Sequence, residues 1–311
     1  MAEINLNKIK TYSLKKRKSK INLKEFAGVC SKGVSFKGFY KSLPHILAAE
    51  NLRAIADAII LSCKNKKQVI FMLGAHVIKC GLSPLIIELI NKGVIKCICL
   101  NGAGVIHDFE IAYAGFTSED VLSGLENGNF GMAKETAEFI NSAIVDGQKK
   151  GFGLGRSVGQ AIKEGNLAHK NLSILHHAVK KAIPVCVSVA IGTDIIHQHP
   201  SFDGAATGWA SQKDFKTFVE MVSLLEGGVI VNFGSAVILP EVFLKALNLA
   251  RNLGFKIKNF TTANFDMIYH YRPAQNLVSR PTKGCGKGFY IIGHHEIMLP
   301  LLTQAIIEQV K

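Results

Sequence analysis

The sequence predicts an α/β fold of the Rossmann-like, doubly wound kind, with a mostly parallel sheet and helices on both faces. Short runs that are apolar throughout alternate along the chain with longer segments whose apolar residues recur at helical spacing. Hydrophobic residues make up 48% and charged residues 19% of the 311 residues, which is a globular composition. Small and polar residues follow nearly every apolar run, as is typical of ligand-binding strand ends in such sheets.

The first half of the chain sets the alternation. Residues 43–64 place apolar side chains at helical spacing, and the run QVIFML at 68–73 predicts a buried strand. A second helix is expected over 82–91, ending at the stop signal Asn91-Lys92-Gly93, and a strand over 94–100. Further helices are expected over 132–146 and 172–182.

The second half repeats the pattern. Strands are expected over 184–191, 228–233, 256–262 and 289–293, and helices over 212–226, 237–253 and 296–310. Strands without polar alternation must be covered on both faces, which favours the parallel sheet. Residues 147–166 and 267–287 are rich in Gly, Lys or Pro and are expected to be long loops, a feature that is often functional.

Charge and composition limit the classes of function. The net charge of +14 attracts anions in general, and much of it lies in a basic N-terminal arm, residues 1–30, which is interpreted as solvated rather than as a specific nucleic-acid binder. Residues 31–311 are expected to form one large domain. The apolar runs are too short to span a bilayer, and no secretory signal is evident. The odd number of cysteines, seven, indicates reduced thiols and a cytoplasmic location.

The residues after the strands are candidates for ligand binding. Glycines in Asn101-Gly102-Ala103-Gly104 and Gly234-Ser235 would let a phosphate approach the backbone closely. Asp194 and Asp266 would accept hydrogen bonds from a ribose hydroxyl, but each is equally well suited to cap a helix. Both interpretations stay open for the two acids.

Histidines form a second group of candidate functional residues. Six of them are expected at strand ends, close in sequence to Asp108 and other acids, and they suit general acid–base catalysis. No metal site is assigned in the main interpretation. The alternative is a divalent metal on four of the histidines, namely His197, His199, His294 and His295.

Taken in order, several motifs resemble the deoxyhypusine synthase family. They are LGAHVIKCGLSPLIIELINKGVIKCICLNGAGVIHDFEIA (73–112), IPVCVSVAIGTD (183–194), GGVIVNFGSAV (227–237), and FTTANFD (260–266) with the later Arg272-Pro273. The resemblance covers most of the chain from about residue 30 onward. It implies a Rossmann-like fold, NAD at the strand ends, and homotetramers whose active sites lie between subunits.

The resemblance also implies roles for particular residues. Family members oxidise spermidine with NAD and transfer a butylamine group to an enzyme lysine and then to an acceptor, which is a protein lysine in the deoxyhypusine synthases. Lys283 would be the nucleophile, with Lys287 as a competitor, and His107 and Asp108 would lie near the amine. The NAD site would be lined by Asn101, Gly102, Ala103, Asp194, Gly234, Ser235, Thr262, Ala263 and Asp266.

Three functional hypotheses follow from these observations. The first is an NAD-dependent transferase acting on spermidine or a related small amine, with His107 as the base and Lys283 as the nucleophile. The second is an enzyme of the same fold with a histidine-rich, metal-assisted hydrolytic site. The third is a non-catalytic member that binds a nucleotide or a protein partner. A bound divalent metal would favour the second, and the absence of any turnover would favour the third.

Overall fold

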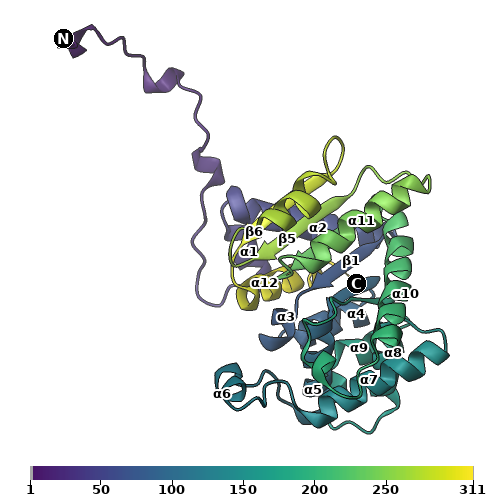
Figure 1. Ribbon diagram of the computed structural model, residues 1–311. Helices are drawn as coiled ribbons and strands as arrows, with labels where there is room; N and C mark the ends of the chain where they lie inside the picture. The colour runs from purple at the N-terminus through teal and green to yellow at the C-terminus, as the bar shows by residue number, and fades with distance from the viewer. Residues whose placement is uncertain (1–2, 311) are drawn as a thin grey trace. The chain divides into compact units, whose positions relative to one another are not determined.

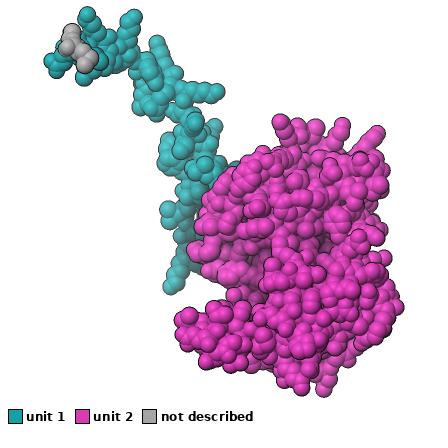
Figure 2. Space-filling model, viewed as in Figure 1, with its two compact units in different colours: residues 1–50 teal, residues 51–311 magenta. Residues whose placement is uncertain are grey.

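The computed structural model describes residues 3–310 and divides the chain into two compact units, residues 1–50 and 51–311 (Figure 2). The expected basic arm, 1–30, lies within the first unit, and its first two residues are outside the described part of the chain. This unit contains three 3-10 turns, each begun by a polar side chain that accepts a backbone N–H, and one helix. They are η1 (Leu6–Lys8), η2 (Leu14–Lys16), η3 (Leu23–Glu25) and α1 (Phe36–Ser42).

The second unit is built on one six-stranded sheet in the order β3-β2-β1-β4-β5-β6. Figure 1 shows β1, β5 and β6 among the surrounding helices. Every neighbouring pair of strands is parallel. This confirms the predicted Rossmann-like, doubly wound α/β fold. The strands are β1 (Val69–Leu73), β2 (Cys97–Asn101), β3 (Val185–Ser188), β4 (Val229–Phe233), β5 (Thr261–Asp266) and β6 (Lys287–Ile292).

Helices and turns connect the strands. α2 (Leu47–Lys64) precedes β1, and α3 (His76–Lys79) and α4 (Ser83–Asn91) lead to β2. The long connection from β2 to β3 contains α5 (Gly102–Ala114), α6 (Val121–Glu126), α7 (Lys134–Lys149), α8 (Leu154–Glu164), η4 (Lys170–Leu172) and α9 (Ile174–Lys180). Later connections contain η5 (Ile195–Gln198), α10 (Gly204–Ser223), α11 (Ile238–Asn252) and the π-helical η6 (Pro273–Ser279), and α12 (His295–Ile307) follows β6.

Both faces of the sheet are covered by apolar side chains. On one face, strand residues such as Met72 and Ile230 belong to one core cluster with Phe218 of α10 and Phe243 of α11. On the other face, Phe233 and Phe265 stack with their ring centroids 4.6 Å apart, and His295 of α12 meets the Phe233 ring edge-on. Two covered faces explain why the strands read as apolar throughout.

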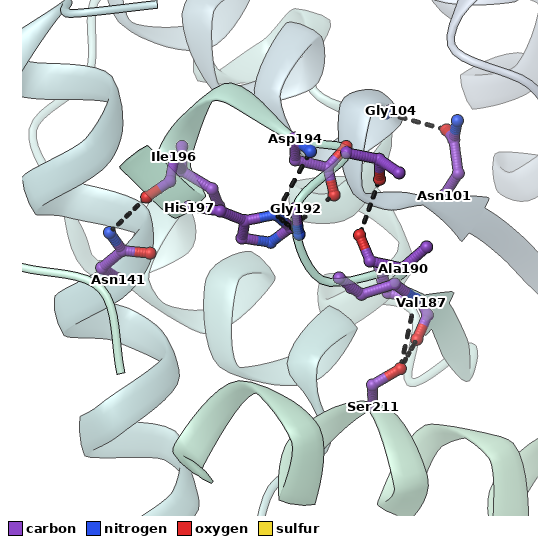
Figure 3. A network of polar contacts seen from close by, with 12 residues as sticks. Asn101, Gly104, Asn141, Val187, Ala190, Gly192, Asp194, Ile196, His197 and Ser211 are labelled. Carbon is purple, nitrogen blue, oxygen red and sulfur yellow. Dashed lines mark hydrogen bonds and ion pairs between the residues drawn. The ribbon is translucent and has the colours of Figure 1, made fainter. Parts of the chain in front are cut away.

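The free edge of β3 is protected by side chains of α10. The N–H of Val187 donates to Asp214 Oδ2 at 2.9 Å, and the N–H of Val189 donates to Ser211 Oγ at 3.3 Å, part of which Figure 3 shows. Ser211 in turn donates to the carbonyl of Val187. These bonds replace the missing strand neighbour, so the edge offers few unpaired groups to another chain.

Several expected elements are corrected by the structure. The strand expected over 256–262 is shifted, because residues 256–260 are not in a strand and β5 is formed by Thr261–Asp266. Residues 147–166 are not a long loop, since they contain the end of α7 and the whole of α8. The other expected loop, 267–287, contains η6. None of the helices in the described part of the chain has the length and apolar composition needed to cross a membrane.

Candidate functional site at the strand ends

The carboxyl ends of β1 and β4 mark the topological switch point of the sheet. The chain leaves β1 toward β2 on one side and leaves β4 toward β5 on the other, which opens a crevice where such folds bind ligands. Two glycines meet there: the N–H of Gly74 donates to Phe233 O at 2.7 Å, and a Cβ on Gly74 would lie 2.5 Å from Gly234 O. Gly234 has a φ of 69°, which also favours glycine.

One cavity of about 190 Å³ opens on the β4 and β5 side of this crevice, and we name it the Asp266 cavity. It is lined by His76, Gly234, Asp266, Met267, His294, His295 and Glu296. Asp266 Oδ1 accepts the N–H of Met267 at 2.8 Å, whereas its buried Oδ2 has no hydrogen-bond partner. Buried His295 Nδ1 also has no partner. Burial lowers the pKa of His295, which keeps its ring neutral near pH 7.

A second cavity, of about 210 Å³, lies beyond β2 and β3, and we name it the His107 cavity. Three carboxylates and one ammonium group line it together with His107, so the cavity is acidic although the whole chain is basic. Its lining residues are Lys79, Ala103, Ile106, His107, Glu110, Ser118, Glu119, Val121, Phe130, Thr193, Asp194 and Ile195. An acidic enclosure of this kind suits a cationic ligand such as an amine.

A hydrogen-bonded chain orients the His107 ring. Thr117 donates its single hydroxyl hydrogen to Glu110, so His107 Nδ1–H is the donor in the 2.6 Å contact between Nδ1 and Thr117 Oγ1. The Nε2 atom then carries the lone pair and can accept a proton. Burial alone would raise the pKa of Glu110, but hydrogen bonds from His107, Thr117 and Thr136 outweigh it and lower the pKa, so Glu110 stays ionised.

Asp194 contacts the start of α5, and its side chain also lines the His107 cavity. Its carboxylate accepts the N–H of Ala103 at the start of α5. The Asn101 side chain accepts the N–H of Gly104, as Figure 3 shows. A Cβ on Gly102 would lie 1.9 Å from Asp194 Oδ2, so glycine is required for this approach. Burial raises the pKa of Asp194 to about 6, opposed by the Ala103 hydrogen bond.

His197 is held in one tautomer by the loop that follows β3. The backbone N–H groups of Gly192 and Asp194 both donate to His197 Nδ1, at 3.0 and 3.2 Å, so the ring hydrogen is on Nε2 (Figure 3). Nε2 lies 3.8 Å from Asp194 Oδ2. Burial lowers the pKa of His197, so the ring acts as a neutral brace of the Asp194 loop.

The structure does not gather the four histidines of the alternative metal site. His197 braces the loop after β3, whereas His294 and His295 line the Asp266 cavity after β6, at the other end of the strand order. Within residues 3–310, no group of three or more His, Cys, Asp or Glu side chains is arranged to hold a metal ion.

Asp108 is placed away from both cavities. Its side chain is fully buried and accepts hydrogen bonds from the Ser173 hydroxyl at 2.5 Å and from the N–H groups of Ile174 and Leu175 at the start of α9. Burial raises its pKa to about 6 against the effect of these bonds. The residue therefore caps α9 and lines neither of the two cavities.

Lys283 and two of the residues expected around NAD lie away from the strand ends. Lys283 is in the turn before β6 and Lys287 is the first residue of β6, a strand of six residues that spans about 20 Å. Both lysines therefore lie at the end of the sheet where the strands begin, whereas the two cavities of their own chain lie where the strands end. Thr262 and Ala263 are fully buried near the beginning of β5 instead of following it.

The site also contains residues that sequence reasoning missed. Glu110, Thr117 and Glu119 belong to the His107 cavity or its hydrogen-bonded chain, and Lys79 enters it from α3. The spacing of His107 and Glu110, three residues apart, could have indicated a shared helix face. This shared face was not predicted because the segment after β2 was interpreted as a strand end rather than as a helix.

Comparisons with known proteins agree on the fold. No protein-family model and no curated protein matches the chain. Among solved structures, an arginine dihydrolase from the ornithine–ammonia cycle in Cyanobacteria is similar with a TM-score of 0.54 and 16% identity, over 84% of this chain and 32% of that one. A ternary complex of AgrE with ornithine and NAD+ gives 0.51 and 14%, over 83% and 33%. A candidate deoxyhypusine synthase from Entamoeba histolytica gives 0.50 and 11%, over 90% and 95%.

These likenesses define a class for the chain. It is an α/β protein with a Rossmann-like fold that enzymes share, including one solved with NAD+ bound. The chain spans about a third of the length of the arginine dihydrolase and of AgrE. At these identities the comparisons show the fold.

Proposed function

We propose that the protein is an NAD-dependent enzyme that oxidises a small amine, with NAD entering the Asp266 cavity and the amine entering the His107 cavity. The observation that carries the proposal is the buried, unpartnered Oδ2 of Asp266 beside Gly234 at the switch point. A buried carboxylate oxygen without a donor is costly, and a ribose hydroxyl would satisfy it.

The residues of the crevice fit a dinucleotide. Asp266 would hold a ribose in the cavity that Gly234, His76 and His295 also line. The N–H groups of Ala103 and Gly104 are already bound by Asp194 and Asn101, so the phosphates would not use the start of α5. When bound, NAD supplies the acceptor for a hydride.

The His107 cavity supplies the other half of the reaction. Its carboxylates, Glu110, Glu119 and Asp194, would bind an ammonium group and orient the carbon that bears it. With NAD bound as the hydride acceptor, His107 Nε2 would take one proton from the ammonium nitrogen as the adjacent carbon gives up its hydride, which would leave a protonated imine. Glu110 and Thr117 hold the ring for this proton transfer.

Aminobutyl transfer from spermidine is the finer form of the proposal, and it rests on the resemblance to deoxyhypusine synthases. Because Lys283 lies where the strands of its own sheet begin, a covalent step through this residue would require Lys283 from a second copy of the chain. That requirement agrees with the homotetramer and shared active sites that the resemblance implies. The final acceptor would be a second amine or a protein lysine.

One observation favours a second class of substrate. Lys79 lines the His107 cavity beside the three carboxylates, so the cavity offers a partner for a carboxylate as well as for ammonium groups. A basic amino acid such as ornithine carries both charges, whereas spermidine carries only positive ones. Replacing Lys79 with Gln should weaken binding of ornithine and leave binding of spermidine unchanged or improved.

The test begins with NAD affinity, measured by calorimetry on the full chain and on Asp266→Asn. Loss of a hydrogen bond to a charged group costs about 1.5–3 kcal/mol, which corresponds to roughly 10- to 150-fold weaker binding. Asp146→Asn, which alters an exposed ion pair with Lys149, is the matched control and should bind NAD normally. Equal affinity in Asp266→Asn and wild type would refute the assigned cofactor position.

Turnover is then measured as NADH formed with spermidine or ornithine, together with release of 1,3-diaminopropane from spermidine. We expect His107→Gln to lose NADH formation while keeping NAD affinity, because the base is lost and the Asp266 cavity is intact. Diaminopropane release would support aminobutyl chemistry. No NADH formation with either amine would contradict the proposed amine oxidation.

A further inference from the structure

A third cavity lies at the beginning of β3, at the other end of the strands from the candidate site. Its volume is about 440 Å³, larger than either strand-end cavity and within the range of small-ligand sites. It is formed where α8 and α10 meet the first residue of β3, Val185. The lining residues are Gly151, Phe152, Gly153, Arg156, Gln160, Lys163, Val179, Ala182, Ile183, Pro184, Val185, Lys213, Asp214 and Thr217. We name it the Arg156 cavity.

Three exposed cations surround this cavity. Arg156 and Lys163 come from α8 and Lys213 comes from α10, and none of the three forms an ion pair among residues 3–310. The Arg156 guanidinium lies 4.0 Å from the centroid of the Phe152 ring, which holds it over the loop that precedes α8. Uncompensated cations around one concave surface attract an anion.

The acid in the cavity does not cancel these charges. Asp214 is buried, and its Oδ2 accepts the N–H groups of Gly155 and Val187 at 2.9 Å each. Its carboxylate is therefore committed to bracing α8 against β3. Gly153 and Gly155 are packing residues for the same brace, because a Cβ on either would collide with Asp214 Oδ1 or Val185 O. The glycines of this segment thus have a structural explanation, whereas the three cations do not.

The lining also has an apolar part. Val179, Ile183 and Pro184 form this apolar wall, and Gln160 and Thr217 add uncharged polar groups. We propose that the Arg156 cavity binds a small organic phosphate, with the phosphate on Arg156, Lys163 and Lys213 and the carbon part of the ligand against the apolar wall. This site is separate from the proposed NAD and amine cavities and does not depend on them.

Binding is tested by calorimetry on the full chain with inorganic pyrophosphate and with phenyl phosphate. We expect saturable binding of one molecule, weakened about tenfold or more in Lys163→Gln and in Lys213→Gln, since each removes a charged hydrogen-bond donor. Phenyl phosphate should bind more tightly than inorganic phosphate because its ring covers the apolar wall. Added salt should weaken every one of these interactions.

Two control variants separate this site from general charge and from the proposed cofactor site. Lys216→Gln removes an exposed lysine of α10 that does not line the cavity, and Asp266→Asn changes the strand-end cavity. Both should bind pyrophosphate as the wild type does. Equal weakening in Lys216→Gln would show diffuse attraction to a basic protein, and altered binding in Asp266→Asn would place the phosphate at the strand ends. Either result, or the absence of saturation, would overturn the proposal.

Discussion

The contact between Gly102 and Asp194 predicts that Gly102→Ala lowers the free energy of unfolding of the wild type but not that of an Asp194→Ala variant. In the wild type, Gly102→Ala places a Cβ 1.9 Å from Asp194 Oδ2 and forces the carboxylate away from the N–H of Ala103. Losing a hydrogen bond to a charged group costs about 1.5–3 kcal/mol, and replacing glycine with alanine in a helix returns at most about 1 kcal/mol. The substitution should therefore destabilise the protein by about 1–2 kcal/mol.

The same substitution should be neutral or stabilising when Asp194 is already alanine. The three nearest atoms to the added Cβ all belong to the Asp194 carboxyl group, so its removal leaves only the helix preference of alanine, worth about 0–1 kcal/mol. Urea unfolding of the wild type, both single variants and the double variant gives the free energies of unfolding and their coupling. If Gly102→Ala changes the free energy of unfolding equally in both backgrounds, the assigned contact is wrong.

Three further predictions concern buried polar groups. Burial raises the pKa of Asp214 from 3.8 to about 7, so its contribution to stability is greatest below pH 4 and is lost as pH rises toward 7, by up to about 4 kcal/mol. The melting temperature of Asp214→Asn should lack that decline, and a wild type that gains stability relative to the variant over this range would contradict the sign. Thr117→Val should shift the pH profile of turnover more than NAD affinity, because it separates His107 from Glu110, and an unshifted profile would argue against the hydrogen-bonded chain. His197→Ala should lower the free energy of unfolding by about 1 kcal/mol, because the part-buried N–H of Asp194 loses its partner whereas the exposed N–H of Gly192 can bond to water, and unchanged urea unfolding would show that the loop does not need the ring.

Much of the fold could be predicted because local patterns decide it. Strands covered on both faces must be apolar throughout, so β1 and β4 were placed within one residue of their observed starts. The polar strand β5 was misplaced, since Asn264 and Thr262 interrupt the apolar pattern. The structure shows that Asn264 accepts a hydrogen bond from Asn232 of β4, so its polarity is satisfied by a partner that is remote in the sequence. Periodicity cannot reveal such a pair.

The positions of site residues could be predicted only where they follow from the order and direction of the strands. Gly234 follows β4 at the switch point and Asp266 ends the neighbouring strand β5, because parallel strands bring their carboxyl ends to the same end of the sheet. The role of Asp108 could not be predicted, since its partners are on α9, more than sixty residues later. For Lys283, motif order gave a place along the chain but could not show that the residue precedes β6, at the end of the sheet where the strands begin.

The two acids that sequence reasoning could not separate are separated by their partners. Asp194 accepts the N–H of Ala103, so a phosphate at the start of α5 would compete with a carboxylate already bound there. Asp266 instead keeps Oδ2 without a donor. A dinucleotide would therefore place a ribose on Asp266, in the cavity that Gly234 also lines. The Asp194→Ala protein made for the stability measurements tests this directly, because its NAD affinity should be unchanged while that of Asp266→Asn falls. A large loss of NAD affinity in Asp194→Ala would instead move the cofactor to the start of α5.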